Sequence, residues 1–243
     1  MSVTLDDLPM TYASTRDSLH RVAVHIVARR RQLLSTKFGL RSSPGGFAAP
    51  AAGPELEVVR TDGHWLVRER TGQPATTTTL DLRTATLAEA AELVEVDLSA
   101  PFDAGDDTPA VGAVEEALAV VPAAALALGD WYAYGWRVLD AAIGAAGPDA
   151  AASVIQLWPE HFDAGCDLAA GRRRTNLGAS PGDGFHADPY LYVGPHDSDR
   201  PGDPDYWNAP FGAVIGYEQL RAAPDPVAAG LAFLQEGMTH LAG

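Results

Sequence analysis

With 243 residues, of which 47% are hydrophobic and 20% charged, the chain can bury a substantial core and has the composition of a folded protein. The formal net charge of -15 argues against nucleic acid and anionic membrane surfaces as partners, because phosphate groups are bound by clustered Lys and Arg. Cys166 is the only cysteine, so no intrachain disulfide can form. The sequence shows neither a signal peptide nor an apolar run long enough to span a membrane, and we expect a soluble, cytoplasmic protein.

The first half of the chain predicts helices and an antiparallel hairpin. A helix is expected over residues 15–34, because apolar residues recur there at the spacing of one buried face, and Ser14 with Asp17 has the spacing of a capping box at its start. Two alternating segments then flank Asp62-Gly63, a pair that suits a type I′ turn, and predict a β-hairpin over residues 55–70. A further strand over 76–82 and a short helix over 86–94 follow.

The second half begins after an acidic, proline-bearing connection, residues 97–109. An Ala-rich helical region follows; Pro122 should interrupt it, because proline cannot donate the helical hydrogen bond, and the second piece is expected over 123–146. Four aromatic residues within 131–136 point in directions about 100° apart, so they cannot all face one core. Strands are expected within 153–158, 162–169, 189–194 and 211–220, and Asp225 with Pro226 should begin a last helix.

These elements predict an α+β fold, mainly antiparallel sheet with flanking helices, in a single domain over residues 1–243. Each half has the order helix, several strands, helix, which suggests an internal duplication with half-repeats at 14–96 and 110–241 joined by the linker 97–109. A short match between the turns Ser43–Phe47 and Ser180–Phe185 is in keeping with duplication, although similar Gly/Pro turns also arise by chance.

The segment 158–195 gathers most of the groups that can carry chemistry. If a strand follows Pro159, His161, Asp163 and Asp167 lie on one face, and Phe162 and Cys166 lie on the opposite, apolar face. His186 and Asp188 repeat the His-x-Asp spacing of His161 and Asp163.

Two histidines with carboxylates form a ligand set for a divalent metal such as iron or zinc, so these four residues are candidate metal ligands. The same groups suit metal-free acid-base catalysis, for which we select His161, Asp163 and His186. The alternative interpretation makes all of them surface and turn residues, because one side of an antiparallel strand is commonly polar.

Arg172, Arg173 and Arg174 form a basic run that is unusual in so acidic a chain. Arginine binds carboxylates and phosphates through two parallel hydrogen bonds, and the Gly-rich turn beyond the run could add backbone amides, so an anionic small molecule is one candidate ligand. Neutralisation of nearby aspartates at the surface is an equally good explanation. Trp158, Tyr190 and Tyr192 could line the same pocket, or could pack as ordinary half-buried rings.

Several phrases of the sequence are distinctive: QLWPEHFD, LGASPGD and PYLYVGP, with the earlier LHRVAVHI and SSPGGF. On these phrases the chain resembles a family of uncharacterised actinobacterial proteins of similar length. The resemblance runs along most of the chain and implies one domain family spanning both halves, but no reaction and no cofactor.

From the residues we predict a small-molecule enzyme with a His/Asp pocket, either metal-dependent or not, acting on an anionic substrate. The alternative is a non-catalytic protein that binds a small ligand in the same pocket. A third hypothesis, an oligomer in which the aromatic residues near Trp131 pack against a second subunit, predicts a homo-oligomer.

Overall fold

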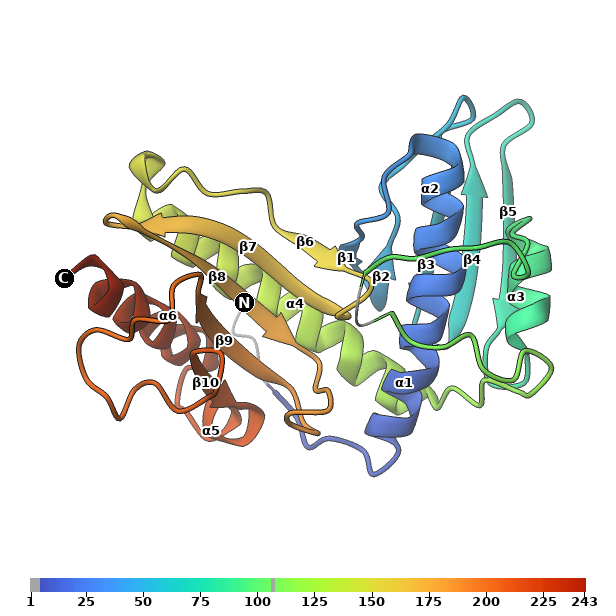
Figure 1. Ribbon diagram of the computed structural model, residues 1–243. Coiled ribbons are helices and arrows are strands. Elements are labelled where there is room, and N and C mark those ends of the chain that lie inside the picture. The colour runs from blue at the N-terminus through green and yellow to red at the C-terminus, as the bar shows by residue number, and fades with distance from the viewer. Residues whose placement is uncertain (1–4, 106–107) are drawn as a thin grey trace. The chain divides into compact units, whose positions relative to one another are not determined.

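The computed structural model describes residues 5–105 and 108–243 (Figure 1). The described chain divides into two compact units. Unit 2 comprises Leu8–Asp130 and Leu157–Phe162, and unit 1 comprises the described residues up to Asp7, Trp131–Gln156 and Asp163–Gly243. The α+β class is confirmed, because the described chain contains two five-stranded antiparallel sheets together with helices.

Unit 2 begins with one continuous helical segment that packs against a sheet of consecutive strands. The sheet has the order β1-β2-β3-β4-β5 with antiparallel neighbours, and Val59, Leu66 and the helical residues Val22 and Ile26 are buried in the core of this unit. The elements are α1 (Tyr12–Val22), the π-helical turn η1 (Ala23–Ala28), α2 (Arg29–Ser35), β1 (Arg41–Ser43), β2 (Gly46–Ala48), β3 (Val58–Asp62), β4 (Trp65–Arg70), β5 (Thr76–Asp81) and α3 (Leu87–Leu93).

Local sequence patterns in this unit were good guides to elements but not always to their ends. The hairpin is confirmed, but Asp62 pairs with Trp65, so the turn is Gly63-His64 and only Gly63 has a positive φ, which rules out the predicted type I′ turn at Asp62-Gly63. The capping box at Ser14 is wrong: α1 begins at Tyr12, and the Ser14 hydroxyl donates to the Thr11 carbonyl from inside the helix.

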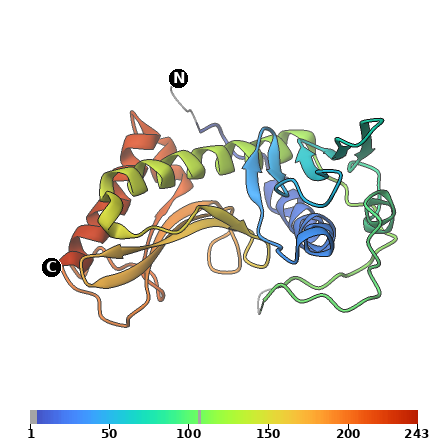
Figure 2. The ribbon, with the colours of Figure 1, turned by 90° about the horizontal axis from the view of Figure 1, so that it is seen from above.

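Helix α4 (Pro122–Ala146) is a single helix of 25 residues, seen uninterrupted in Figure 2. Proline 122 begins this helix and does not interrupt one, because the first helical residues need no amide donor. The predicted helix before it is wrong, since residues 110–121 form no helix and include a bridge from Ala117 to Thr86.

The second sheet has the order β10-β9-β8-β7-β6, and its strands β7 to β10 lie in unit 1 with the helices that pack on them. Glycines of this unit allow the helices to approach closely: a Cβ on Gly135 of α4 would lie 2.5 Å from Ala179, and one on Gly230 of α6 would lie 2.8 Å from Leu191. The elements after α4 are η2 (Pro148–Ala150), β6 (Gln156–Trp158), β7 (Asp163–Ala170), β8 (Arg173–Ser180), β9 (Tyr190–Pro195), β10 (Ala213–Gly216), α5 (Tyr217–Arg221) and α6 (Pro226–Ala242).

The aromatic residues of α4 are mostly buried within unit 1. Trp131, Tyr132 and Tyr134 are fully buried; the Trp131 ring lies 5.2 Å from that of Tyr134 and 5.8 Å from that of Tyr217. The Tyr134 hydroxyl donates to the Pro226 carbonyl at the start of α6. These rings therefore pack in the core of unit 1, whereas the Trp136 ring is half-exposed. The four rings do not all face one core, as the helical spacing predicts.

Along the chain, the order helix, five consecutive strands, helix occurs twice, which is the arrangement that an internal duplication produces. The short sequence match does not support it, because Ser43–Gly46 forms the turn between β1 and β2, whereas Ser180–Phe185 begins the connection between β8 and β9. The expected linker 97–109 belongs to unit 2, apart from residues 106–107, which lie outside the described residues. Over the described parts of the chain, the structure contains no helix that is both long and apolar enough to span a bilayer.

Candidate functional site

The sheet of unit 1 has one face packed on helices and one polar face. Leu177, Ala179, Leu191 and Val193 belong to the face that meets α4 and α6. Strand alternation places their neighbours on the opposite side, which we call the polar face. It is formed by Asp163, Gly165 and Asp167 of β7, by Arg174, Asn176, Gly178 and Ser180 of β8, and by Tyr190 and Tyr192 of β9.

Tyr192 crosses the polar face on a path left open by two glycines. Gly165 pairs with Gly178 and Gly178 with Tyr192, and a Cβ on Gly178 would lie 2.2 Å from the Tyr192 ring. The phenol thereby reaches across two strands and donates its hydroxyl to the Asp163 carboxylate. Burial, followed by the nearby negative charge of Asp163, raises the pKa of Tyr192 well above its ordinary value, so Tyr192 acts as a hydrogen-bond donor and not as a base.

Asp183 organises the loop between β8 and β9. Its Oδ2 accepts hydrogen bonds from the Tyr190 hydroxyl at 2.5 Å and the Ser180 hydroxyl at 3.3 Å. Its Oδ1 accepts the backbone amides of Phe185 at 2.8 Å and His186 at 3.1 Å. A carboxylate with four donors fixes the loop, and its role is to position the residues that follow it.

The loop presents Phe185 and His186 beside a second exposed ring, Phe211. Phe185 is 46% exposed and Phe211 37%, and their rings meet edge to face with centroids 5.1 Å apart. The Phe211 ring also lies 6.2 Å from that of Tyr192, and the Phe185 ring lies 5.9 Å from that of Tyr190. Together these rings form an apolar surface at one end of the polar face, which we call the Phe185–Phe211 surface.

His186 is held in one tautomer. Its Nδ1 lies 2.9 Å from the backbone carbonyl of Asp188, which can only accept a hydrogen bond, so Nδ1 carries the proton of the neutral ring. Nε2 then offers a lone pair. Asp188 contacts the His186 ring through its backbone carbonyl and not through its carboxylate.

The other half of the predicted site belongs to unit 2. His161 lies exposed in the turn Pro159–Phe162, and Trp158, at the end of β6, is 38% exposed. The expectation that His161 and Asp163 alternate along one strand is wrong, because β7 begins only at Asp163 and Phe162 before it has a φ of 57°. The expectation of a solvated strand face is also wrong at Asp163, which is 7% exposed.

A metal site gains no support from these residues. Across 5–105 and 108–243, no three His, Cys, Asp or Glu side chains are grouped so that they could hold a metal ion. The proposed ligands His161, Asp163, His186 and Asp188 are divided between the two units, one in unit 2 and three in unit 1.

Two of the three arginines of the run lie on a strand. Arg173 and Arg174 begin β8, a strand that we did not predict, so the Gly-rich turn is seven residues away along an extended chain. The Arg173 Nη2 lies 2.6 Å from Asp199 Oδ2, and Arg174 forms an ion pair with Asp167. These contacts are the ones expected if the run neutralises aspartates; Arg172 lies exposed in the turn before β8.

Sequence reasoning missed one His-carboxylate pair of the polar face. His196 Nε2 lies 2.8 Å from Asp167 Oδ2 and 3.4 Å from Asn176 Oδ1. Asp167 lies on β7 and His196 follows β9, and β8 lies between these two strands in the sheet. Because β8 was not predicted, the sequence could not show that the two residues meet. Cys166, in contrast, is the inert core thiol that its alternation with Phe162 predicts: it is 4% exposed, and burial raises its pKa to about 12.

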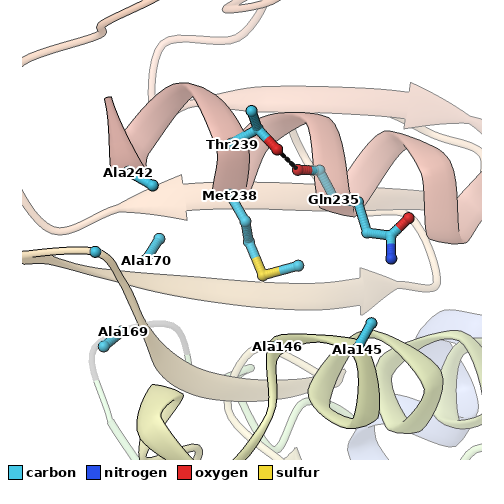
Figure 3. Close-up of a pocket in the computed structure, with 9 residues that line it drawn as sticks. Ala145, Ala146, Ala169, Ala170, Gln235, Met238, Thr239 and Ala242 are labelled. Atoms are coloured by element: carbon cyan, nitrogen blue, oxygen red, sulfur yellow. Dashed lines mark hydrogen bonds between the residues drawn. The ribbon is translucent and has the colours of Figure 1, made fainter.

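A separate cavity of about 430 Å³ lies between the C-terminal ends of α4 and α6 and the turn after β7 (Figure 3). Its walls are mainly alanine, such as Ala145 and Ala170, with Met238 and Gln235 from α6. It contains no titratable side chain, so the reactive groups of unit 1 lie elsewhere, on the polar face.

Comparison with known proteins adds no family to this description. No protein-family model matches the sequence, and no curated protein and no solved structure matches it. The resemblance to an actinobacterial family therefore remains a prediction, and the function is inferred from the site alone.

Proposed function

We propose that this protein binds a small aromatic molecule on the Phe185–Phe211 surface of unit 1. The observation that carries the proposal is the pair of exposed rings, edge to face at 5.1 Å, beside His186 on a loop fixed by Asp183. Adjacent exposed rings in a water-soluble chain are a common mark of a binding surface. Because the four hydrogen bonds to Asp183 already order the loop, binding costs little further conformational entropy.

The polar contact of this ligand would come from His186. Its Nε2 accepts a hydrogen bond while the ring is neutral, so a ligand that combines an apolar ring with an N–H or O–H donor fits the surface best. Arg173 and Arg174 are already paired with aspartates, which weakens the case for an anionic ligand held by the arginine run. We therefore propose a small ligand, as the sequence analysis does, but an aromatic one with a hydrogen-bond donor and not an anionic one.

An enzyme acting through His186 is the second candidate. The hydrogen bond from Nδ1 to the Asp188 carbonyl favours it, because the fixed tautomer leaves Nε2 available as a general base towards a bound substrate. If the ligand is also a substrate, His186→Gln should lower kcat by about 100-fold or more, the usual contribution of general-base catalysis. An unchanged kcat in this variant would contradict catalysis by His186 and would be compatible with binding alone.

A ligand screen against the full chain tests the binding proposal. Small aromatic compounds that raise the Tm of the wild type are re-tested on Phe185→Ala/Phe211→Ala, which removes both rings. Trp65→Ala is the matched control, because Trp65 is a ring on the other sheet that is 38% exposed, close to the 37% of Phe211. We expect the Tm shift to be lost in the double variant and kept in the control. Equal shifts in all three proteins would overturn the proposal.

A further inference from the structure

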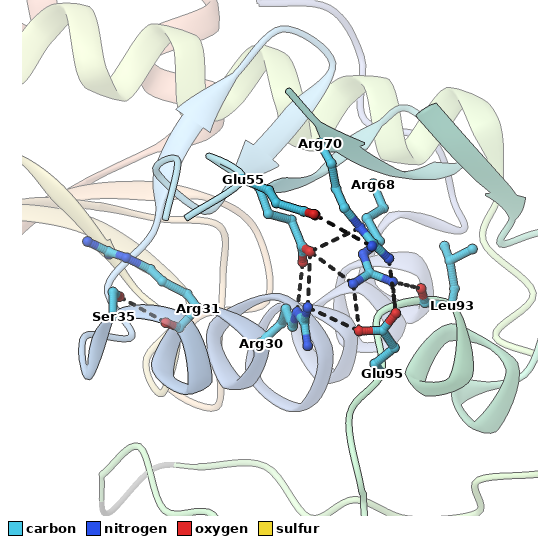
Figure 4. Close-up of polar contacts among 9 residues, drawn as sticks. Arg30, Arg31, Ser35, Glu55, Arg68, Arg70, Leu93 and Glu95 are labelled. Carbon is cyan, nitrogen blue, oxygen red and sulfur yellow. Dashed lines mark hydrogen bonds and ion pairs between the residues drawn. The ribbon is translucent and has the colours of Figure 1, made fainter. Parts of the chain in front are cut away.

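Three arginines of unit 2 meet on one exposed carboxylate, that of Glu95 (Figure 4). Arg68 Nη1 and Arg70 Nη2 each lie 2.9 Å from Oε1 of Glu95. Arg68 Nη2 lies 2.9 Å and Arg30 Nη2 3.3 Å from Oε2. Each carboxylate oxygen is thus contacted by two guanidinium nitrogens, which is the manner in which arginines hold an oxyanion.

The guanidinium groups come from separate elements, and most of them are covered. Arg30 is on α2 and is 13% exposed, whereas Arg68 and Arg70 are on β4 and are 4% and 32% exposed. The buried Glu57, 4% exposed, accepts two hydrogen bonds from Arg30 and one from Arg68 on the side away from solvent. Glu57 orients these two arginines, and the solvent side of the cluster is left to Glu95, which is 57% exposed.

Glu95 lies at a backbone position that favours glycine. Helix α3 ends in a Schellman motif, in which the Val96 amide donates to the Ala91 carbonyl and the Glu95 amide to the Glu92 carbonyl. Glu95 is the residue of this motif in the left-handed region, with a φ of 56°. A glutamate is held here against its backbone preference, so the contacts of its side chain with the arginines must compensate.

One buried donor of the arginine cluster has no acceptor in the described part of the chain. Arg68 Nε is buried and has no hydrogen-bond acceptor among the residues that the structure describes. A carboxylate offers two oxygens, and both oxygens of Glu95 already take two donors each. A phosphate group has three terminal oxygens and a larger charge, so it matches a cluster of three guanidinium groups better than a carboxylate does.

We propose that Arg30, Arg68 and Arg70 form a binding site for a phosphate group, and that Glu95 occupies this site as an intramolecular competitor. A phosphate displaces the exposed Glu95 side chain and takes over its contacts. With Glu95 withdrawn, the three arginines face Glu55 and Glu57 and keep one unit of positive charge in a chain of net charge -15. The site is in unit 2 and is independent of the ligand proposed for unit 1.

Calorimetric titration of the full chain with inorganic phosphate, at constant ionic strength, tests the proposal. In Glu95→Gly the competitor is removed and the backbone strain relieved, so we expect phosphate to bind about tenfold tighter than to the wild type, or better, because a tethered group competes at high effective concentration. Glu92→Gln, which removes an exposed glutamate of α3 and leaves the arginines untouched, should match the wild type. Adding Arg70→Gln to Glu95→Gly should abolish the gain.

Two comparisons decide between the possible outcomes. Acetate at the same ionic strength should bind Glu95→Gly much more weakly than phosphate; equal binding would identify the site as a carboxylate site and overturn the phosphate assignment. If Glu95→Gly does not fold, the same titrations are made with Glu95→Gln. If folded Glu95 variants bind phosphate no tighter than the wild type and Glu92→Gln do, Glu95 is only a structural ion-pair partner and the proposal fails.

Discussion

At the scale of single residues, Gly178 determines where Tyr192 can lie. The ring rests on the glycine backbone, and the hydroxyl reaches Asp163 because neither Gly165 nor Gly178 has a side chain in its path. Gly178 lies on the strand next to that of Tyr192 and Gly165 lies one strand further, and the three residues are distant in sequence, so nothing local to any of them predicts the contact. Tyr190 lies two residues before Tyr192 on β9, and its hydroxyl donates to Asp183 instead. Burial raises the pKa of Tyr190 as well.

Gly178→Ala should destabilise the protein by about 1–3 kcal/mol, the usual cost of overpacking, because the added methyl group would lie 2.2 Å from the Tyr192 ring. Gly144→Ala is the matched control: Gly144 is an exposed position within α4 with nothing within 4 Å of an added Cβ, so this change should stabilise by about 0.5–1 kcal/mol. Urea unfolding of both variants measures the difference. A Gly178→Ala variant as stable as the wild type would show that Tyr192 lies elsewhere.

At the scale of elements, the ion-pair network fastens α2, β4 and the end of α3 together within unit 2. Hydrogen bonds and charges of Arg68, Arg30 and Arg70 lower the pKa of Glu95 to about 2. Burial by itself would raise the pKa of Glu57, but the hydrogen bonds from Arg30 and Arg68 outweigh it and leave that pKa lowered. Glu95 therefore stays ionised in the folded state well below the pH at which an unfolded glutamate takes up a proton, and the pKa of Glu57 is shifted in the same direction.

This predicts an acid-dependent contribution of Glu95 to stability. A carboxyl group with a lowered pKa in the folded state stabilises above its ordinary pKa of 4.5, and the stabilisation is lost as the pH falls towards 2. The difference in Tm between the wild type and Glu95→Gln should thus be largest above pH 5 and shrink steadily between about pH 4.5 and 2. Thermal melts at a series of pH values measure it; a difference that is constant over this range would contradict the shift.

Elements defined by local chemistry were predicted from the sequence, and those defined by their neighbours were not. The hairpin 58–70 has its turn and its alternating apolar and polar residues within one segment. The starts of α3 and α6 have side-chain caps: Thr86 with Glu89 in α3, and Asp225, which accepts the Ala228 amide, in α6. Strand β8 has the sequence RRTNLGAS, with little apolar alternation, and is a strand because β7 and β9 pair with it on both sides.

At the scale of the whole molecule, the chain passes between the two units at four points, after Asp7, Asp130, Gln156 and Phe162. Each unit is therefore assembled from segments that are distant in sequence. Within unit 2, the Arg21 guanidinium donates to the Val111 carbonyl, the Leu118 amide to the Ala85 carbonyl, and the Leu40 amide to the Leu157 carbonyl. The two compact units therefore do not coincide with the predicted half-repeats 14–96 and 110–241.

A cut in the acidic segment should therefore not separate the chain into two halves. If a protease site is inserted after the exposed Asp103 and cleaved, we expect the fragments 1–103 and 104–243 to co-elute in size-exclusion chromatography at the volume of the uncut protein, because both contribute to unit 2. Fragments that elute apart and remain folded would show that the half-repeats are the independent domains.

Local sequence patterns predicted the α+β class, the hairpin of β3 and β4, the Asp225 cap of α6, the buried cysteine and the segment 158–195 in which polar and aromatic groups gather. Those features follow from hydrophobic periodicity and from chemistry within a few residues. Packing between distant segments, in contrast, brings Tyr192 to Asp163 and three arginines from two elements to Glu95. Each of these contacts depends on strand register or on packing between segments far apart in the chain, and no spacing within one segment encodes either.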